Sequence, residues 1–390
     1  MSWNILLYGA TGYSGNLIAE EMRYWAERDP GVFNLILGGR EGERLKAMAN
    51  RYGADYRVFG LDERRDARRA LTDVDVVLNA AGPFAWTAQR LAKVAMELGC
   101  HYVDINGEAD VYNKLDDLHL EAMQHGVALV SGAGFWSAAS DWLLEDGLKH
   151  FPADEPLETV RIAMSRIQTF SRGSAETVWR SLRQQVVVLR KTEENGAERL
   201  VPWHEPVGKL ERTFDFTAPG DKERDLRIAS AASLVDTLSA RLTLERYKCM
   251  PRSVESYIET DLGRRIAYQA GALMSAFAAT RASRALVRQT LSWLSEGPSP
   301  AERGRERHLV ILQLEDRYRR NLVDWRWETP NVYEFTAQLA VGVAAGVGIQ
   351  VGGRKLAGWC SPAEALIRLR QDAAARVLRG CNAIEDRSAR

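Results

Sequence analysis

Short apolar runs alternate with amphipathic stretches over the first 135 residues of the chain. Apolar runs of this length predict buried strands, here residues 5–8, 34–40, 56–59, 74–79, 101–104 and 127–130. The stretches between them, with apolar positions three or four residues apart, predict helices at 16–22, 43–52, 64–71, 87–98 and 111–125. Repeated strand–helix units of this size predict an α/β fold with a Rossmann-type, doubly wound parallel sheet.

The pattern changes after about residue 140. Residues 160–165 alternate between polar and apolar side chains, and residues 210–216 and 256–258 do so more weakly. Period-two alternation predicts a second, α+β domain built on a mixed sheet. Residues 308–314 and 332–338 predict later strands or the start of a buried helix, and residues 362–378 predict an amphipathic helix. We therefore divide the chain into residues 1–138, 139–335 and 336–390.

The charge balance and the cysteine and histidine content of the chain argue against some classes of function. The chain has 390 residues, with 52 Lys plus Arg and 52 Asp plus Glu, so its formal net charge is zero. This charge balance argues against nonspecific electrostatic binding of nucleic acid. The four cysteines form no C-x-x-C pair and the six histidines show no ligand spacing, so no metal site is expected. No basic segment with an apolar region is visible before the first strand, so we expect no signal peptide and a reducing, cytoplasmic location.

Two stretches with almost no charged residues, 267–280 and 335–351, raise the question of a membrane. Both are shorter than the roughly 20 apolar residues that span a bilayer. They are rich in Gly, Ala, Ser and Gln rather than Leu and Ile. We expect buried or interface helices and no integral membrane span, and peripheral contact with a membrane stays open.

The most informative motif is the glycine loop after the first strand, composed of Gly9, Ala10, Thr11, Gly12, Tyr13, Ser14 and Gly15. A strand, a glycine turn and a helix in that order are the context of a dinucleotide-binding loop. Its glycines let the backbone approach a pyrophosphate, and the helix N-terminus offers N–H groups to phosphates. The alternative is a tight strand–helix turn without a ligand, although such a turn needs one glycine rather than three.

The end of the second strand bears on the choice between NAD and NADP. An acidic residue about 20 positions after the loop usually binds the ribose hydroxyls of NAD. This strand ends instead at Arg40, and a guanidinium there suits a 2′-phosphate. Arg44 would help, whereas Glu41 would oppose this binding if its side chain pointed inward. We therefore expect NADP rather than NAD, and the alternative for Arg40 is a solvated charge at a strand end.

Two further groups follow strand ends, where ligands bind in open α/β sheets. The residues expected along the middle of the cofactor follow the fourth strand and are Asn79, Ala80, Ala81, Gly82 and Pro83. Asp104 and Glu108 follow the fifth strand, and either carboxylate could handle a proton during reduction. The alternative is a structural role for both residues, in which Asp104 caps the following turn and Glu108 forms an ion pair with a nearby basic residue.

Four of these segments recur in order in a known family. Residues 8–15, 38–40, 77–84 and 101–108 together resemble the saccharopine dehydrogenase-like oxidoreductases, which include saccharopine reductases and trans-acting enoyl reductases of lipid synthesis. Residues 134–141 and 171–175 are similar to later motifs, with Trp136 and Ala139 where the family typically has aspartate and proline. The resemblance implies a Rossmann domain, NAD(P), a second domain that covers the nicotinamide and mediates homodimer formation, and C-terminal helices that return to the first domain.

These observations predict an NADP-dependent oxidoreductase. It would transfer a hydride to or from a C=O, C=N or activated C=C bond of a small-molecule substrate. One alternative is a sensor or scaffold that binds NADP without turnover, because convincing acid–base residues are few. Another is a lipid-associated, trans-acting enoyl reductase whose apolar stretches touch membrane or acyl substrate.

Overall fold

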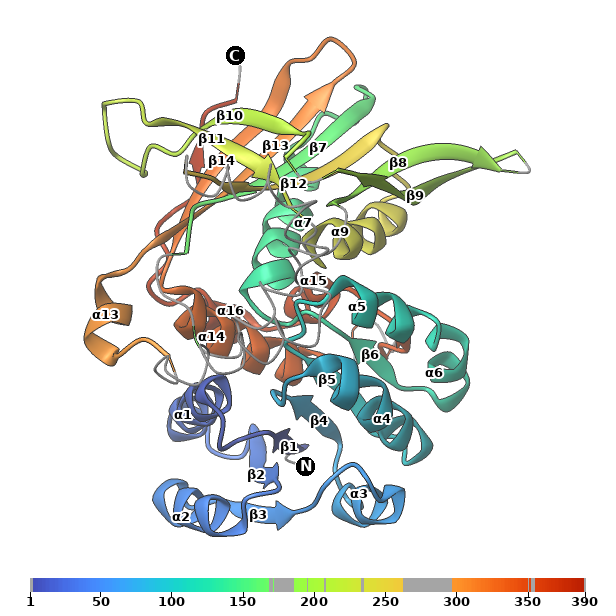
Figure 1. The fold of residues 1–390 in the computed structure, drawn as a ribbon, viewed down its shortest axis with the longest axis vertical. Coiled ribbons are helices and arrows are strands. Elements are labelled where there is room, and N and C mark those ends of the chain that lie inside the picture. Colours follow the sequence, from blue (N-terminus) through green and yellow to red (C-terminus); the bar gives the residue numbers. More distant parts are fainter. Residues whose placement is uncertain are drawn as a thin grey trace, which may run out of the picture. The chain divides into compact units, whose positions relative to one another are not determined.

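The computed structural model describes residues 3–167, 171, 186–194, 196–206, 208–232, 235–261, 297–349, 351 and 355–388 (Figure 1). The chain divides into two compact units. The first comprises Met1–Trp142 and Tyr333–Arg379, and the second comprises Leu143–Val332 and Gly380–Arg390. Two segments singled out in the sequence, 172–175 and 267–280, lie outside the described residues.

A seven-stranded sheet forms the centre of the first unit, with the order β15-β6-β5-β4-β1-β2-β3. Every neighbouring pair in it is parallel. Its strands are β1 (Trp3–Tyr8), β2 (Phe33–Gly39), β3 (Asp55–Val58), β4 (Val76–Asn79), β5 (His101–Asp104), β6 (Ala128–Val130) and β15 (Gly358–Trp359). The expected Rossmann-type parallel sheet is thus confirmed, and β15 adds a short strand from the C-terminal part of the chain.

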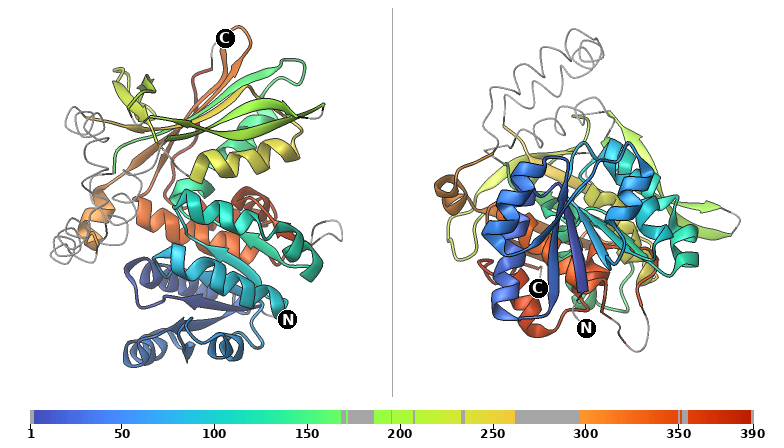
Figure 2. Two further views of the ribbon diagram at one scale, coloured as in Figure 1. Left: turned by 45° about the vertical axis from the view of Figure 1, so that its right-hand side comes forward. Right: turned by 90° about the horizontal axis from the view of Figure 1, so that it is seen from below.

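Helices lie on both sides of this sheet (Figure 2). They are α1 (Tyr13–Arg28), α2 (Gly42–Tyr52), α3 (Arg64–Ala70), α4 (Phe84–Glu97), α5 (Ala109–Asp116), α6 (His119–His125), α14 (Val332–Gly346), α15 (Pro362–Leu366) and α16 (Gln371–Val377). The helix α14 is apolar and buried, and Phe335, Leu339 and Val343 on it are fully buried. Among the described residues, no helix combines the length and the apolar character that crossing a membrane would need.

Two segments predicted as single helices are each broken into two. The predicted helix 111–125 forms α5 and α6, and His119 at the start of α6 accepts a hydrogen bond from the backbone N of Trp359 at 3.0 Å. The predicted helix 362–378 forms α15 and α16, and Arg368 between them donates to the carbonyl of Ile349 at 2.9 Å. Long-range hydrogen bonds at both breaks hold the chain in its observed path.

The buried histidine at the start of β5 makes the stability of the first unit depend on pH. The Nδ1 atom of His101 accepts a hydrogen bond from the backbone N of Ala128 at 2.9 Å. Burial lowers the pKa of His101 from 6.5 to about 4, and the charge of Lys355 adds to this effect. The unfolded chain therefore binds a proton more readily between these values, and folding stability falls as the pH drops through this window.

We expect this effect to cost about 3 kcal/mol of unfolding free energy between pH 7 and pH 4. Urea denaturation at several pH values would measure it. In His101→Gln, which keeps an acceptor but cannot titrate, the loss in this window should be smaller by most of that amount. The same pH dependence in both proteins would contradict the assignment to His101.

A mixed sheet of nine strands forms the second unit, with the order β10-β11-β12-β7-β13-β14-β16 and the β8–β9 hairpin attached to β12. Only the β12–β7 pair is parallel among the pairings of the described strands in this sheet. The strands are β7 (Leu157–Met164), β8 (Val186–Glu194), β9 (Ala197–Glu205), β10 (Glu211–Asp215), β11 (Leu226–Ala231), β12 (Ser253–Glu259), β13 (His308–Asp316), β14 (Asn321–Thr329) and β16 (Glu385–Asp386). This arrangement confirms the expected mixed sheet.

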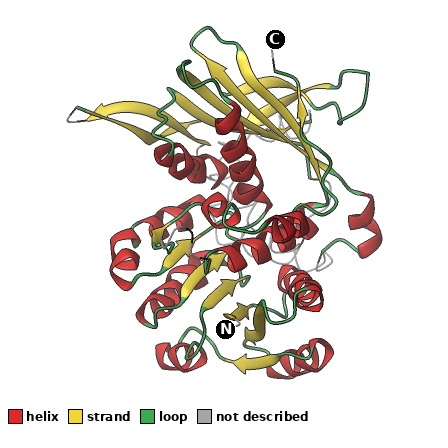
Figure 3. Cartoon of the chain, turned by 180° about the vertical axis from the view of Figure 1, so that it is seen from behind, coloured by secondary structure: helices red, strands yellow, loops and turns green. Residues whose placement is uncertain are grey.

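Two helices, α7 (Ser140–His150) and α9 (Val235–Arg246), lie against one face of the mixed sheet (Figure 3). Gly147 lets α7 approach closely, because a Cβ atom there would lie 2.5 Å from Leu312 Cδ2. The Thr237 hydroxyl of α9 donates to the Ser256 hydroxyl of β12 at 2.9 Å. A further short helix, α13 (Pro300–Arg305), begins with a capping box formed by Ser299 and Glu302.

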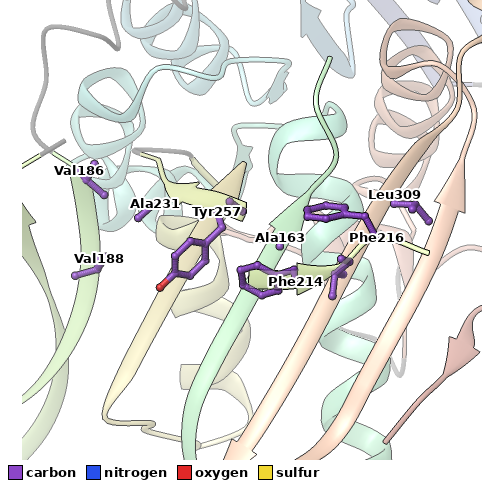
Figure 4. Close-up of a cluster of buried hydrophobic side chains, with 10 residues drawn as sticks. Ala163, Val186, Val188, Phe214, Phe216, Ala231, Tyr257 and Leu309 are labelled. Atoms are coloured by element: carbon purple, nitrogen blue, oxygen red, sulfur yellow. The ribbon is translucent and has the colours of Figure 1, made fainter. Parts of the chain in front are cut away.

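An apolar cluster on the mixed sheet includes Phe214, Phe216 and Tyr257 (Figure 4). Beside it lies a buried ion pair, in which Arg161 binds the Glu315 carboxylate through two hydrogen bonds of 2.8 and 3.0 Å. The two-residue period of β7 places Ala163 in the cluster and Arg161 next to it on the same face. This second core is separate in sequence from the apolar strands of the first unit.

Candidate cofactor-binding site

The glycine loop is held against the end of β2. The backbone N atoms of Gly9 and Ala10 both donate to the carbonyl of Gly38, at 2.9 and 3.3 Å. The backbone N of Gly12 donates to the carbonyl of Gly9 at 3.1 Å, and α1 begins at the next residue. These hydrogen bonds fix the loop at the carboxyl edge of the parallel sheet.

Each glycine of the loop serves a different purpose. Gly9 has a φ of +85°, and a Cβ atom there would lie 2.7 Å from the backbone N of Ala81. At Gly15 a Cβ atom would lie 2.1 Å from the carbonyl O of Gly9, so the turn itself requires glycine. Gly12 is exposed, and a Cβ atom there would meet only the Gly9 carbonyl, at 3.3 Å. The protein's own packing thus requires Gly9 and Gly15, whereas Gly12 leaves space in front of the helix.

That space lies at the positive end of the α1 dipole. Gly12 is the N-cap residue and has no side chain that could accept hydrogen bonds from the first helical turn. No acidic residue lies in this first turn. An exposed, uncapped helix N-terminus next to a residue without a side chain is suited to an anionic group such as a pyrophosphate. The loop therefore fits a dinucleotide.

Two arginines lie at the adjacent end of β2. Arg40 follows the strand and is exposed, while burial raises the pKa of Tyr8 and the Arg40 charge opposes this rise. Arg44 donates to the carbonyl of Thr11 at 3.1 Å and pairs with Glu41 at 2.9 Å. The carboxylate of Glu41 is therefore engaged by Arg44, and Arg40, exposed after β2, stays the residue predicted to bind a 2′-phosphate.

A buried amide organises the loop after β4. The Oδ1 atom of Asn79 accepts a hydrogen bond from the backbone N of Ala81 at 3.0 Å. Its Nδ2 atom donates to the hydroxyls of Thr87 and Tyr102, at 3.2 and 3.1 Å. These hydrogen bonds shape the loop in which Ala80 and Ala81 are half-buried and Gly82 and Pro83 are exposed. Asn79 itself is fully buried, so a ligand at this edge would contact the backbone that Asn79 shapes rather than its amide.

The carboxylate of Asp104 connects the ends of β5 and β6. Its Oδ2 atom accepts from the Tyr102 hydroxyl at 2.8 Å. Its Oδ1 atom accepts from the backbone N of Asn106 at 3.0 Å, the Ser131 hydroxyl at 2.7 Å and the backbone N of Gly132 at 3.1 Å. Burial raises the pKa of Asp104, and these four hydrogen bonds partly offset the rise. Both oxygens are therefore engaged in fixing the neighbouring loops.

Glu108 lies at the start of α5, and its side chain is half-buried. Its backbone N donates to Asn106 Oδ1 at 2.8 Å, and its carbonyl accepts from Asn106 Nδ2 at 3.1 Å. Asn106 also donates to the Ser131 hydroxyl at 3.3 Å. The sites predicted after β5 are thus joined through Asn106 into the same network as Asp104.

We expect Asp104→Asn to destabilise the first unit by about 1–3 kcal/mol. The amide would present N–H groups to at least one of the four donors that now face the carboxylate, leaving buried donors without acceptors. Urea denaturation would measure the loss. An Asp104→Asn protein as stable as the parent would contradict this structural role.

Some residues at this edge could not be found from the sequence. Tyr333 and Thr336 come from the C-terminal segment, where Tyr333 packs edge-on against Tyr13 with ring centroids 5.2 Å apart. The Thr336 hydroxyl accepts from the backbone N of Phe135 at 3.0 Å. Ser137 is buried and has a φ of +124°, a strained conformation for a residue other than glycine. Neither the long-range contacts nor the strain has a local sequence signal.

Comparison with known proteins supports the sequence motifs. Residues 5–130 match the family model described as the saccharopine dehydrogenase NADP binding domain. A trans-acting enoyl reductase of Mycobacterium ulcerans is 31% identical over 145 residues, which cover 36% of this chain and 34% of that protein. A lipid droplet localized protein of Caenorhabditis elegans is 27% identical over 161 residues, covering 39% of this chain and 38% of that protein. The chain thus matches only about a third of the length of each of these curated relatives.

The fold is also similar to a solved structure over its whole length. Apo saccharopine dehydrogenase (L-Glu forming) from Saccharomyces cerevisiae aligns with a TM-score of 0.58 and 14% sequence identity. The alignment covers 99% of this chain and all of that one. The resemblance inferred from the sequence is therefore confirmed in the nucleotide-binding segment and in the fold.

Proposed function

Because residues 5–130 match the family model of the saccharopine dehydrogenase NADP binding domain, we propose that this protein is an NADP-dependent oxidoreductase with a small-molecule substrate. It transfers a hydride to or from a C=O, C=N or activated C=C bond. The observation that carries this proposal is the exposed N-terminus of α1, where Gly12 is an N-cap residue without a side chain and leaves space for a pyrophosphate. When bound, the reduced nicotinamide supplies the hydride.

The residues of the carboxyl edge have distinct roles toward this cofactor. The loop of Gly9, Ala10, Thr11, Gly12, Tyr13, Ser14 and Gly15 binds the pyrophosphate. Arg40 binds the 2′-phosphate, and Arg44 braces the loop through Thr11. The residues along the middle of the cofactor are Asn79, Ala80, Ala81, Gly82 and Pro83. The buried Asn79 shapes this segment, and its exposed backbone forms the contact surface.

Asp104 and Glu108 take different parts in the proposed reaction. The four hydrogen bonds to Asp104 make it a positioning residue, which sets the backbone after β5 and β6. Glu108 is half-buried beside this network and is the candidate for proton transfer to or from the substrate. During reduction by NADPH, Glu108 would donate a proton, so a pH profile of turnover that loses its alkaline limb in Glu108→Gln would support this role.

Turnover with deuterated NADPH tests the proposed function. The protein would be incubated with [4-²H]NADPH and a panel of aldehydes, imines and enoyl thioesters, and the products analysed by mass spectrometry. Deuterium in a product supports hydride transfer. Tight NADPH binding without transfer to any of these classes would instead favour a sensor or scaffold that binds NADP without turnover.

An enoyl substrate is the second candidate, favoured by the relatives named as trans-acting enoyl reductases. The match covers only about a third of the length of those relatives, so their substrate comes to this chain only as a candidate. Enoyl thioesters in the panel separate this candidate from carbonyl and imine reduction. Co-sedimentation with liposomes would test whether the protein also makes peripheral contact with a membrane.

A cytoplasmic location and a homodimer complete the proposal. The cysteines, Cys100, Cys249, Cys360 and Cys381, are all free, which is typical of a reducing compartment. Within the described ranges, no group of metal-binding side chains is present. Light scattering after size-exclusion chromatography would measure the mass in solution, and a mass near that of one chain would contradict the homodimer.

A further inference from the structure

One indole ring reaches the surface from an otherwise buried segment that follows β6. Every residue from 131 to 141 is buried except Trp136, which is half-buried. The ring of Trp136 packs edge-on against that of Phe135, with ring centroids 5.4 Å apart, and Phe135 itself is buried. Trp136 is therefore the one side chain of this segment that a ligand can reach.

The backbone that presents Trp136 is strained. A turn of π-helix spans Phe135–Ala139, and inside it the φ and ψ angles of Trp136 and Ser137 are not helical. Ser137 has a φ of +124°, and its buried hydroxyl has no hydrogen-bond partner among the described residues. The serine side chain therefore does not offset the strain. Strained backbone in a π-helical turn is typical of functional sites, so we looked for a function of the side chain that it presents.

The segment lies at the carboxyl edge of the parallel sheet. The backbone N of Ala133 donates to the carbonyl of Asp104, at the end of β5, at 2.7 Å. In the strand order of this sheet, a dinucleotide binds with one half over β2 and β3 and the other half over β4, β5 and β6. Arg40 after β2 is proposed to bind the 2′-phosphate of the adenosine half. The nicotinamide half then falls on the side of the sheet that carries Trp136.

The segments of the first unit at this half of the edge contain no Lys, Arg or His; they are residues 79–88, 104–109, 131–139 and 333–340. The charged residues that they contain are acidic, namely Asp104, Glu108 and Glu334. A carboxylate on the substrate would find no counter-charge in these segments and would meet negative charge instead. The indole ring of Trp136 offers an uncharged substrate a large apolar surface.

We propose that Trp136 forms a wall of the substrate site beside the nicotinamide and selects a substrate whose reacting carbon carries an uncharged, apolar group, aromatic or alkyl. This inference rests on the proposed function, because it takes the place of the nicotinamide from the proposed binding of NADP. It adds the substrate class and a specificity-determining residue. Trp136 acts here by contact with the substrate and takes no part in proton transfer.

Two aldehydes of similar shape test the substrate class. They are 4-isopropylbenzaldehyde, which is neutral, and 4-carboxybenzaldehyde, which carries a carboxylate. Binding to the full chain saturated with NADP⁺ would be measured by saturation-transfer NMR, because the oxidised cofactor cannot reduce an aldehyde and no turnover interferes. We expect the neutral aldehyde to bind at least about tenfold more tightly than the carboxylate. Absence of saturable binding of the neutral aldehyde, or equal affinity for both, would overturn the proposal.

Variants at position 136 test the role of the indole. Trp136→Ala should weaken binding of 4-isopropylbenzaldehyde about tenfold, and Trp136→Phe, which keeps an apolar ring, should retain most of the affinity. Trp136→Arg should reverse the preference in favour of 4-carboxybenzaldehyde, because it supplies the missing counter-charge. The matched control is Trp203→Ala, which removes an exposed tryptophan of β9 and should bind both aldehydes like the parent.

An unchanged preference in both Trp136→Ala and Trp136→Arg would overturn the assignment of Trp136. Titration of each protein with NADP⁺ separates this result from a failure of the proposed function. A parent protein that binds NADP⁺ while its position-136 variants bind both aldehydes as it does contradicts this inference alone. A parent protein that does not bind NADP⁺ contradicts the proposed function, and this inference with it.

Discussion

Gly12→Val should weaken NADPH binding about 100-fold, equivalent to about 2.7 kcal/mol. Gly12 is exposed at the N-cap of α1, and a branched side chain there would occupy the space that a pyrophosphate needs. Its φ of −75° and ψ of 168° are accessible to valine, so the backbone itself can keep its conformation. Titration of tryptophan fluorescence with NADPH would measure the loss.

The control for this variant is Gly304→Val, a glycine of α13 where a Cβ atom would meet nothing within 4 Å. It should bind NADPH like the parent. Thermal denaturation of both variants would show whether the glycine-loop protein is still folded. A folded Gly12→Val protein with unchanged NADPH affinity would contradict the placement of the pyrophosphate at this loop.

Arg40→Ala should weaken NADPH binding by roughly 10- to 150-fold and leave NADH binding almost unchanged. The range corresponds to the loss of one charge-assisted contact with a phosphate, about 1.5–3 kcal/mol. Arg40 is exposed after β2, and the competing acid Glu41 is engaged by Arg44. Equal losses for both nucleotides, measured by the same titration, would contradict the assignment of Arg40 to the 2′-phosphate.

Arg40→Lys refines this prediction. Lysine keeps the positive charge but lacks the forked donors of the guanidinium. We therefore expect an NADPH affinity between those of the parent and Arg40→Ala. A lysine variant as weak as the alanine variant would indicate that geometry rather than charge dominates at this position.

The first unit could be predicted from the sequence because its strands are buried on both faces and appear as continuous apolar runs. The run 76–79 and the glycine motif 9–15 each carry their own signal. The mixed sheet was less predictable. In β9 most side chains are exposed, so it lacks the alternation that marks a half-buried strand, and its pairing with β8 determines its conformation.

The candidate site was likewise predictable from the sequence only in part. The residues of the glycine loop could be identified because a pyrophosphate-binding turn has a fixed sequence pattern. Tyr102 is buried in the core, and its hydroxyl links Asn79 to Asp104. The contact of Thr336 with Phe135 joins positions 201 residues apart. Such side-chain directions and long-range contacts arise only from the packed fold.

The central claim is that the carboxyl edge of the first unit binds NADP through the glycine loop and Arg40. Its most direct test is a titration of the purified protein with NADPH and NADH, followed by tryptophan quenching and nicotinamide fluorescence. We predict saturable binding of NADPH at one site and markedly weaker binding of NADH. Binding of neither nucleotide would contradict the account, and equal affinity for both would contradict its assignment of NADP.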